Sequence, residues 1–415
     1  MGKGVEDLKE KMDNYKIKKD KKIAFAAFFY FLASAINSTI KIVVPSVSTH
    51  SGLISAITGA FILIFFAMAF PIVWQRSKFV LIRSYAVFGF LYLFSIVLSI
   101  LRGDPIDLII SGSAFLTFAW WIPVGVYACS VSDSKILYDV FYKGSYFLAF
   151  VLLLMFVFHP LNIYGETGYN MYFGTTIIIP ALFHLNEILK KRKLFVTLFF
   201  LLELVAILVY ANRGVLASIL FFVFYFYFIR SYNSSKKIVA IFFLGACAVF
   251  FLVFKEQIFT FFLNILEGLG IQSRTLSMLL DSSFLADSSN RDVIWNQSMR
   301  MIEQRPILGW GLGGEYYELA RAAGDVEVID NSFNSHNAII QNIVDFGVIG
   351  GIVASLIFIV PYFGMRRIEN IYLHDFVVIC GAAVLPCFIS AAGLFVKPIA
   401  AIFFYLYYIT RRRKR

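Results

Sequence analysis

Long apolar runs recur along most of this 415-residue chain, and they constrain its fold more than any other feature. Each run is about 17–24 residues long, close to the roughly 20 residues that an α-helix needs to cross a bilayer. Sixty per cent of the residues are hydrophobic, which is more apolar surface than a soluble domain could bury. The alternating strands of a membrane barrel are not seen in the pattern. The sequence therefore predicts an all-α polytopic membrane protein.

The apolar runs divide into about twelve predicted membrane spans. Their approximate bounds are 23–44, 52–74, 82–101, 106–128, 137–158, 172–189, 194–211, 215–229, 238–254, 337–363, 373–392 and 396–410. With the N-terminus inside, most of the 37 lysines and arginines fall on the cytoplasmic side, as the positive-inside rule expects. The net charge of +11 thus sets topology and does not indicate nucleic-acid binding. We expect both termini to be cytoplasmic and residues 1–415 to form a single integral membrane domain.

One long polar segment, residues 255–335, interrupts the apolar runs between the predicted ninth and tenth spans. The topology places this loop on the extracytoplasmic side. Within it, residues 291–302 repeat apolar side chains at helical spacing, which predicts an amphipathic helix on the membrane surface or against the helix bundle. Farther on, glycines 309, 311, 313 and 314 let the backbone approach another surface or a ligand closely. The context of a nucleotide-binding loop is missing here.

Three polar residues on the outer side are candidates for chemistry: Arg213, Arg291 and His336. Arg213 lies in a tight turn between the seventh and eighth spans, where an arginine either serves a function or snorkels to headgroups. Arg291 begins the amphipathic helix and either faces a site or is solvated; for Arg300 and Arg305 we favour the solvated face. His336 stands at the mouth of the tenth span and can accept a proton near neutral pH, although a lone histidine is more often structural.

Two arginines and one histidine suit one kind of reaction. Guanidinium groups stay charged and bind phosphate oxygens in pairs, so two of them suit a diphosphate. A histidine can deprotonate a hydroxyl that attacks a carbon bearing that diphosphate as its leaving group. No His, Asp, Glu or Cys cluster has metal-ligand spacing, so we expect no metal and no cofactor, with arginine neutralising the leaving-group charge. The combination predicts glycosyl transfer from a lipid-linked diphosphate sugar.

Three short motifs surround these residues. They are Asn212-Arg213-Gly214, then Arg291 with Trp295 and Pro306-Ile307-Leu308-Gly309-Trp310-Gly311, and Ser335-His336-Asn337 followed by Asp345-Phe346-Gly347-Val348-Ile349-Gly350. In this order, and with a long outer loop late in the chain, the sequence resembles the O-antigen polymerase and O-antigen ligase superfamily of bacterial envelope enzymes. The resemblance covers most of the chain in layout, whereas the motifs cover its second half.

The resemblance implies a GT-C-like helical fold in the bacterial plasma membrane and an undecaprenyl-diphosphate-linked glycan as donor. It also implies metal-independent, inverting transfer on the outer leaflet. In that reaction Arg213 and Arg291 would bind the diphosphate, and His336 would be the catalytic base.

The acceptor and the class of protein remain open at this point. We favour a polymerase, which joins repeat units on two lipid carriers and works beside a flippase and a chain-length regulator. A ligase would instead transfer the finished chain to lipid A-core or another acceptor. A flippase or other transporter would place its polar groups near the bilayer midplane. A non-catalytic assembly protein would tolerate loss of all three candidate residues.

Overall fold

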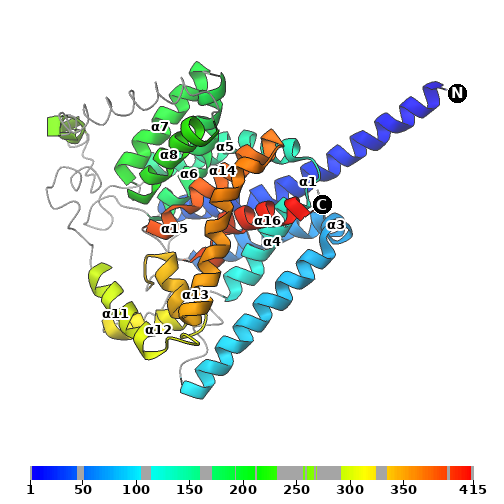
Figure 1. Cartoon of the computed structure of the whole chain (residues 1–415). Coiled ribbons are helices and arrows are strands. Elements are labelled where there is room, and N and C mark those ends of the chain that lie inside the picture. Colours follow the sequence, from blue (N-terminus) through cyan, green and yellow to red (C-terminus); the bar gives the residue numbers. More distant parts are fainter. Residues whose placement is uncertain are drawn as a thin grey trace. The chain divides into compact units, whose positions relative to one another are not determined.

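The computed structural model describes residues 2–43, 51–103, 114–158, 171–191, 193–210, 213–230, 256–257, 259–265, 268, 291–323, 334–389 and 393–412. Throughout these ranges the regular structure is helical, without a β-strand (Figure 1). Six of the described helices are long and apolar enough to cross a membrane, and three shorter apolar helices accompany them. The prediction of an all-α membrane protein is confirmed, and the count of twelve spans stays a prediction.

The described helices largely follow the predicted spans. They are α1 (Gly2–Val43), α3 (Ser51–Arg102), α4 (Ile122–Ser130), α5 (Ser134–Phe158), α6 (Met171–Lys191), α7 (Leu194–Tyr210), α8 (Arg213–Phe224), α11 (Arg291–Gln304), α12 (Gly314–Ala323), α13 (Ala338–Gly364), α14 (Ile371–Val384), α15 (Pro386–Ile389) and α16 (Pro398–Arg412). Short π-helical turns cover Thr117–Trp121 and Tyr225–Arg230, and 3-10 turns cover Met365–Arg367 and Leu394–Val396. The predicted span 238–254 and much of the loop 255–335 lie outside the described residues.

The chain divides into two compact units. The first comprises Met1–Ser34, Gly52–Gly144 and Arg291–Arg415, and the second comprises Ala35–Ser51 and Ser145–Asn290. Among the candidate residues, Arg291 and His336 belong to the first unit and Arg213 to the second. The single integral domain stays a prediction.

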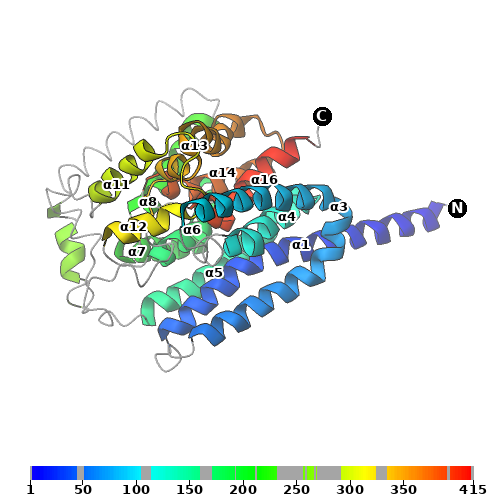
Figure 2. The ribbon, with the colours of Figure 1, turned by 90° about the horizontal axis from the view of Figure 1, so that it is seen from below.

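In the first unit, helix α3 contains two predicted spans in one element. The spans meet at Ser77, whose φ of −140° and ψ of 22° break the helical geometry. Figure 2 shows the two arms on either side of this turn, with the first arm beside α1. The inner connection predicted for residues 75–81 is therefore wrong in form, because the helix continues on both sides of a single non-helical residue.

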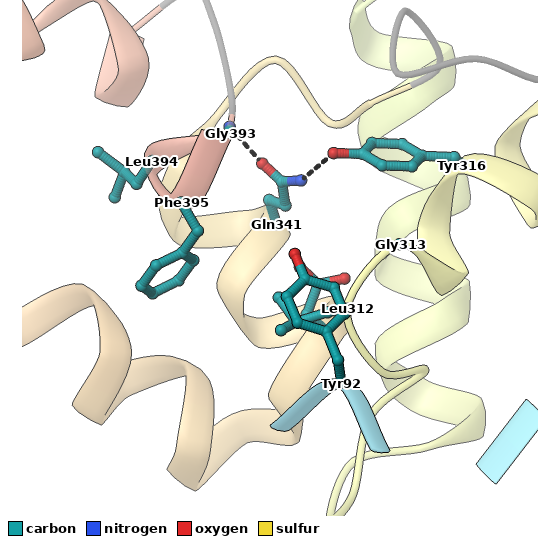
Figure 3. Close-up of a pocket in the computed structure, with 9 residues that line it drawn as sticks. Tyr92, Leu312, Gly313, Tyr316, Gln341, Gly393, Leu394 and Phe395 are labelled. Carbon is teal, nitrogen blue, oxygen red and sulfur yellow. Dashed lines mark hydrogen bonds between the residues drawn. The ribbon is translucent and has the colours of Figure 1, made fainter. Parts of the chain in front are cut away.

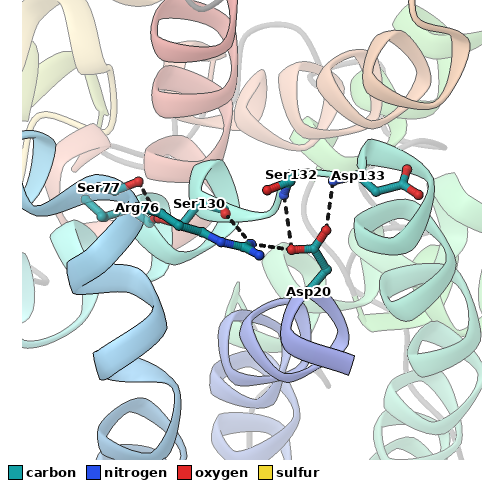
Figure 4. Close-up of polar contacts among 7 residues, drawn as sticks. Asp20, Arg76, Ser77, Ser130, Ser132 and Asp133 are labelled. Carbon is teal, nitrogen blue, oxygen red and sulfur yellow. Dashed lines mark hydrogen bonds and ion pairs between the residues drawn. The ribbon is translucent and has the colours of Figure 1, made fainter. Parts of the chain in front are cut away.

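A buried ion pair fastens this turn to α1 (Figure 4). Asp20 of α1 accepts a hydrogen bond from Nη1 of Arg76, and it also accepts the backbone N–H groups of Ser132 and Asp133. Arg76 donates in addition to the carbonyl of Ser130 at 3.1 Å. A carboxylate at 3% exposure needs such partners to offset its lost hydration. The basic leader is thus anchored by one of its few acidic residues.

Helix α4 packs along α16 and fixes the segment that follows α15. Trp121 is 1% exposed, its ring centroid lies 5.6 Å from that of Tyr405, and its Nε1 donates to the carbonyl of Leu394 at 2.8 Å. Gly125 is required for this approach, because a Cβ there would lie 2.2 Å from the Tyr405 ring. The packing holds residues 393–395 in place beside α13, where they line a pocket described below.

In the second unit, α6 and α7 share a buried polar pair that the sequence analysis did not single out. Nδ1 of His184 lies 2.8 Å from Oε1 of Glu203, and both side chains are fully buried. The Tyr146 ring packs against the imidazole, with the two centroids 4.4 Å apart. Polar groups inside apolar helices are kept where they pair with one another, so this contact joins the two helices.

Candidate functional site

The backbone of His336, directly before α13, is held in one unusual conformation. Its φ of 49° makes it the single non-glycine residue with a left-handed backbone in the described part of the chain. Hydrogen bonds to the side chains of Asn334 and Asn337 support that conformation. The side-chain oxygen of Asn334 accepts the His336 N–H at 2.9 Å, and Asn337 caps α13 by accepting the N–H groups of Ile339 and Ile340. A left-handed residue of this kind costs about 1–2 kcal/mol and persists only where the surroundings over-determine it.

Ser335, the residue before His336, is completely buried and uses all its polar groups. Its carbonyl accepts Nε1–H of Trp295 at 2.8 Å. Its hydroxyl donates to Oε2 of Glu315 at 2.7 Å and accepts from Ser298 at 3.3 Å. Helices α11 and α12 therefore both bond to the residue that sets the direction of the histidine.

Helix α11 has the form that the sequence predicts. It begins at Arg291, and its inner face buries Met301 in a cluster with Val344 of α13, Trp310 and Leu319. Trp295 lies one helical turn after Arg291, so the start of α11 is the end that reaches the His336 segment. The proximity of Arg291 itself to His336 stays a prediction. The side chain of Arg291 lies outside the described residues.

The glycine-rich segment approaches a break inside α13. Gly347 has a φ of 73° and a ψ of 176°, which stops the helical hydrogen bonds that Val344 and Asp345 would otherwise accept. The Trp310 N–H donates to the Val344 carbonyl at 2.8 Å and the Gly311 N–H donates to the Asp345 carbonyl at 2.9 Å, so both acceptors are satisfied from outside. The close approach predicted for these glycines is confirmed, and its target is protein backbone.

Two arginines lie against Trp310 at this break. The guanidinium carbon of Arg305 lies 3.9 Å from the ring centroid, and that of Arg102 lies 5.5 Å away. Arg102 also donates to the Trp310 carbonyl at 2.6 Å. The solvated face favoured for Arg305 is wrong, because the guanidinium packs on an aromatic ring that the sequence could not place. Arg300 is exposed, in agreement with the prediction.

A small pocket lies beside the first turns of α13 (Figure 3). Its lining includes Tyr92, Tyr316, Gln341 and Asp345, and its free volume of about 10 Å³ is room for one water molecule. Gln341 crosses it, donating to the Tyr316 hydroxyl at 3.2 Å and accepting the Gly393 N–H at 2.6 Å. The Asp345 carboxyl is 3% exposed, and Oδ1 meets no hydrogen-bond donor among the described residues.

Glu315 is the acidic group that bonds directly to the His336 segment. It is fully buried at the start of α12. Burial raises the pKa of this carboxyl to about 8, and the hydrogen bond from Ser335 offsets only part of the lost hydration. The pKa of Tyr316 is raised well above its usual range by burial and then by the charges of Glu315 and Asp345. Glu315 therefore carries a proton at neutral pH.

Arg213 begins α8, in the second unit. Residues 211–212, between the end of α7 and Arg213, lie outside the described residues, as does the Arg213 side chain, so the tight turn stays a prediction. Its pairing with Arg291 stays a prediction. No group of three or more His, Cys, Asp or Glu side chains within the described ranges could hold a metal ion.

The sequence analysis missed Glu315 and Asp345 as members of this site. Both stand inside or beside motifs that it used, Glu315 directly after Gly313-Gly314 and Asp345 at the start of Asp345-Phe346-Gly347. An acidic residue that directly follows a glycine run or precedes a buried helix break was the available signal. Burial could not be inferred from it, because the burial depends on contacts with Ser335, which lies 20 residues away.

Comparison with known proteins gives one match. A family model described as O-antigen ligase matches residues 196–355, from within α7 to within α13. The matched range contains Arg213, Arg291 and His336 together with the glycine-rich segment and the break at Gly347. No curated protein matches the chain.

Proposed function

We propose that this chain, whose residues 196–355 match the family model described as O-antigen ligase, is a member of the O-antigen polymerase and ligase superfamily and polymerises lipid-linked oligosaccharide repeat units. The donor is a glycan on undecaprenyl diphosphate, and the product is O-antigen, capsular polysaccharide or exopolysaccharide. The reaction takes place on the outer leaflet of the bacterial plasma membrane, with both chain termini in the cytoplasm. A flippase and a chain-length regulator are the partners that such a reaction needs.

The observation that best supports the proposal is the fixed backbone conformation of His336. Catalysis by proton transfer requires a base held in one position relative to the reacting hydroxyl. Asn334 accepts the His336 N–H, Asn337 caps the helix that follows, and Trp295 of α11, the helix that Arg291 begins, donates to the carbonyl of Ser335. A histidine that merely filled space would not need a left-handed backbone with this many supporting hydrogen bonds.

Each candidate residue then has one role in an inverting transfer. The acceptor hydroxyl oxygen attacks the anomeric carbon of the donor while the His336 imidazole takes the hydroxyl proton. The bond between that carbon and the diphosphate oxygen breaks, and its electron pair leaves on undecaprenyl diphosphate. Arg213 and Arg291 offset the negative charge that grows on this leaving group. Attack opposite the leaving group inverts the anomeric configuration.

The purified protein with one lipid-linked repeat unit as sole substrate tests the proposal. We expect products that contain many repeats. A ligase, the second candidate, is favoured by the description of the matching family and would give no product until a separate acceptor is added.

Substitution of the three residues tests their roles. His336→Ala should lower the rate by about 10²–10⁴-fold, and Arg213→Ala or Arg291→Ala by about 10²–10³-fold, each with the protein still in the membrane. Arg300→Ala on the exposed side of α11 and His374→Ala in α14 are the matched controls. Polysaccharide of normal length from all three variants would refute the catalytic assignment.

A further inference from the structure

Glu315 contacts Ser335, the residue directly before His336, and has no role in the transfer step itself. Its carboxyl oxygen Oε2 accepts the Ser335 hydroxyl at 2.7 Å, and both side chains are fully buried. Ser335 is covalently joined to His336, so any change at this hydrogen bond moves the peptide plane that begins the left-handed residue. The contact is therefore placed to control where the imidazole points.

The other contacts of Ser335 cannot replace this one. Trp295 holds the Ser335 carbonyl, which fixes one end of the peptide. Ser298 reaches the hydroxyl at 3.3 Å, a longer and weaker bond than the one to Glu315. Without the carboxyl the serine hydroxyl would lose its acceptor in a dry interior, which is unfavourable for a buried donor. The segment around Ser335 and His336 would then be more stable in another conformation.

The contact between Glu315 and Ser335 lies among other buried polar groups. Tyr316 on its own helix, Asp345 from α13 and Tyr92 from α3 surround the same buried region, and α11 contributes the Ser298 hydroxyl. Glu315 and Ser335 are both fully buried, so bulk water cannot replace the carboxyl as the acceptor.

We propose that Glu315 is a positioning residue for His336, which acts through Ser335 and holds the catalytic segment in place. This inference rests on the function proposed above. It adds a prediction that the transfer reaction alone does not make: the alignment of His336 is lost when the hydrogen bond between Glu315 and Ser335 is removed, and a substitution that keeps an acceptor oxygen at position 315 keeps the alignment.

The test compares Glu315→Gln, Ser335→Ala and wild type in lipid nanodiscs, with kcat and KM measured from pH 6 to 9.5. Glutamine is neutral and still offers Ser335 an acceptor oxygen. We expect Glu315→Gln to keep kcat within about threefold of wild type at pH 7. Ser335→Ala should lower kcat by about 10–100-fold, with KM changed less than twofold, because a misplaced group near the reacting atoms has effects of this size. Glu303→Gln on the exposed side of α11 is the matched control.

A second readout separates this inference from the proposed function. Diethyl pyrocarbonate modifies exposed neutral imidazole, and mass spectrometry reports the rate at His336 and at His374 in the same sample. We expect Ser335→Ala to change the rate at His336 more than threefold and to leave His374 unchanged, whether or not glycosyl transfer is observed. An unchanged rate at His336, or a kcat in Glu315→Gln that falls as far as in Ser335→Ala, would overturn the positioning role. Loss of transfer activity in wild type itself would count against the function alone.

Discussion

Replacing Gly347 by alanine should disrupt the contact between the break in α13 and the glycine-rich segment. The residue has a φ of 73° and a ψ of 176°, a backbone conformation that residues other than glycine rarely adopt. A Cβ there would lie 2.1 Å from the carbonyl oxygen of Ile307 and 2.8 Å from that of Pro306. Backbone strain of about 1–3 kcal/mol and overpacking of about 1–3 kcal/mol together destabilise the first unit by roughly 2–6 kcal/mol.

Three buried cysteines of the same unit make this destabilisation measurable. Cys129, Cys380 and Cys387 are at most 4% exposed, so a thiol-reactive fluorophore labels them only as the fold opens. On the scale of soluble domains, the loss corresponds to a fall in melting temperature of roughly 5–15 °C. Gly89→Ala in α3 is the matched control, because a Cβ at that position meets no atom within 4 Å. If Gly347→Ala melted within about 1 °C of Gly89→Ala, the account of the helix break would be wrong.

Two further predictions concern buried carboxyl groups. The folded-state pKa of Glu315 is raised from 4.5 to about 8, so its stabilising effect is complete below pH 4.5 and is lost as pH rises through 8. At about 1.4 kcal/mol per unit, the loss is at most roughly 5 kcal/mol, and the melting temperature of wild type should fall more steeply between pH 6 and 9 than that of Glu315→Gln; parallel curves would contradict this. Asp20→Ala leaves Arg76 and two backbone N–H groups without their acceptor and should destabilise the protein by about 3–5 kcal/mol. Asp13→Ala on the exposed side of α1 should change the melting temperature little, and equal effects of the two substitutions would rule out the buried pair as an anchor.

Much of the fold could be predicted because membrane helices are specified locally. The length of each apolar run sets the length of each helix, and the 3.6-residue spacing after Arg291 was enough to define α11 and its buried face. The turn at Ser77 was mispredicted for a physical reason. The predicted spans 52–74 and 82–101 left the residues between them outside a helix, whereas Arg76 there pairs with Asp20, 56 residues earlier, and only Ser77 departs from helical geometry.

The site was predictable in its outline and not in its chemistry. His336 and Arg291 were recognisable from their positions at the starts of two helices. The partners of Ser335 were not, because they come from two helices that meet only in the folded unit. Arg305 was misjudged for the same reason, since its aromatic partner Trp310 turns back toward it only through the glycine-rich segment.

The hydrogen bonds across the break in α13 also order the steps of biogenesis. A helix that breaks in an apolar layer leaves carbonyl groups that lipid cannot satisfy. The N–H groups of Trp310 and Gly311 that satisfy them belong to a segment the ribosome makes before α13. That segment must therefore be in place when α13 inserts, so the carbonyl groups at the break are satisfied only if the segment lies on the correct side of the membrane. A topology error in the loop would leave the carbonyl groups at the break in α13 without hydrogen-bond donors. Membrane quality-control machinery could recognise that defect.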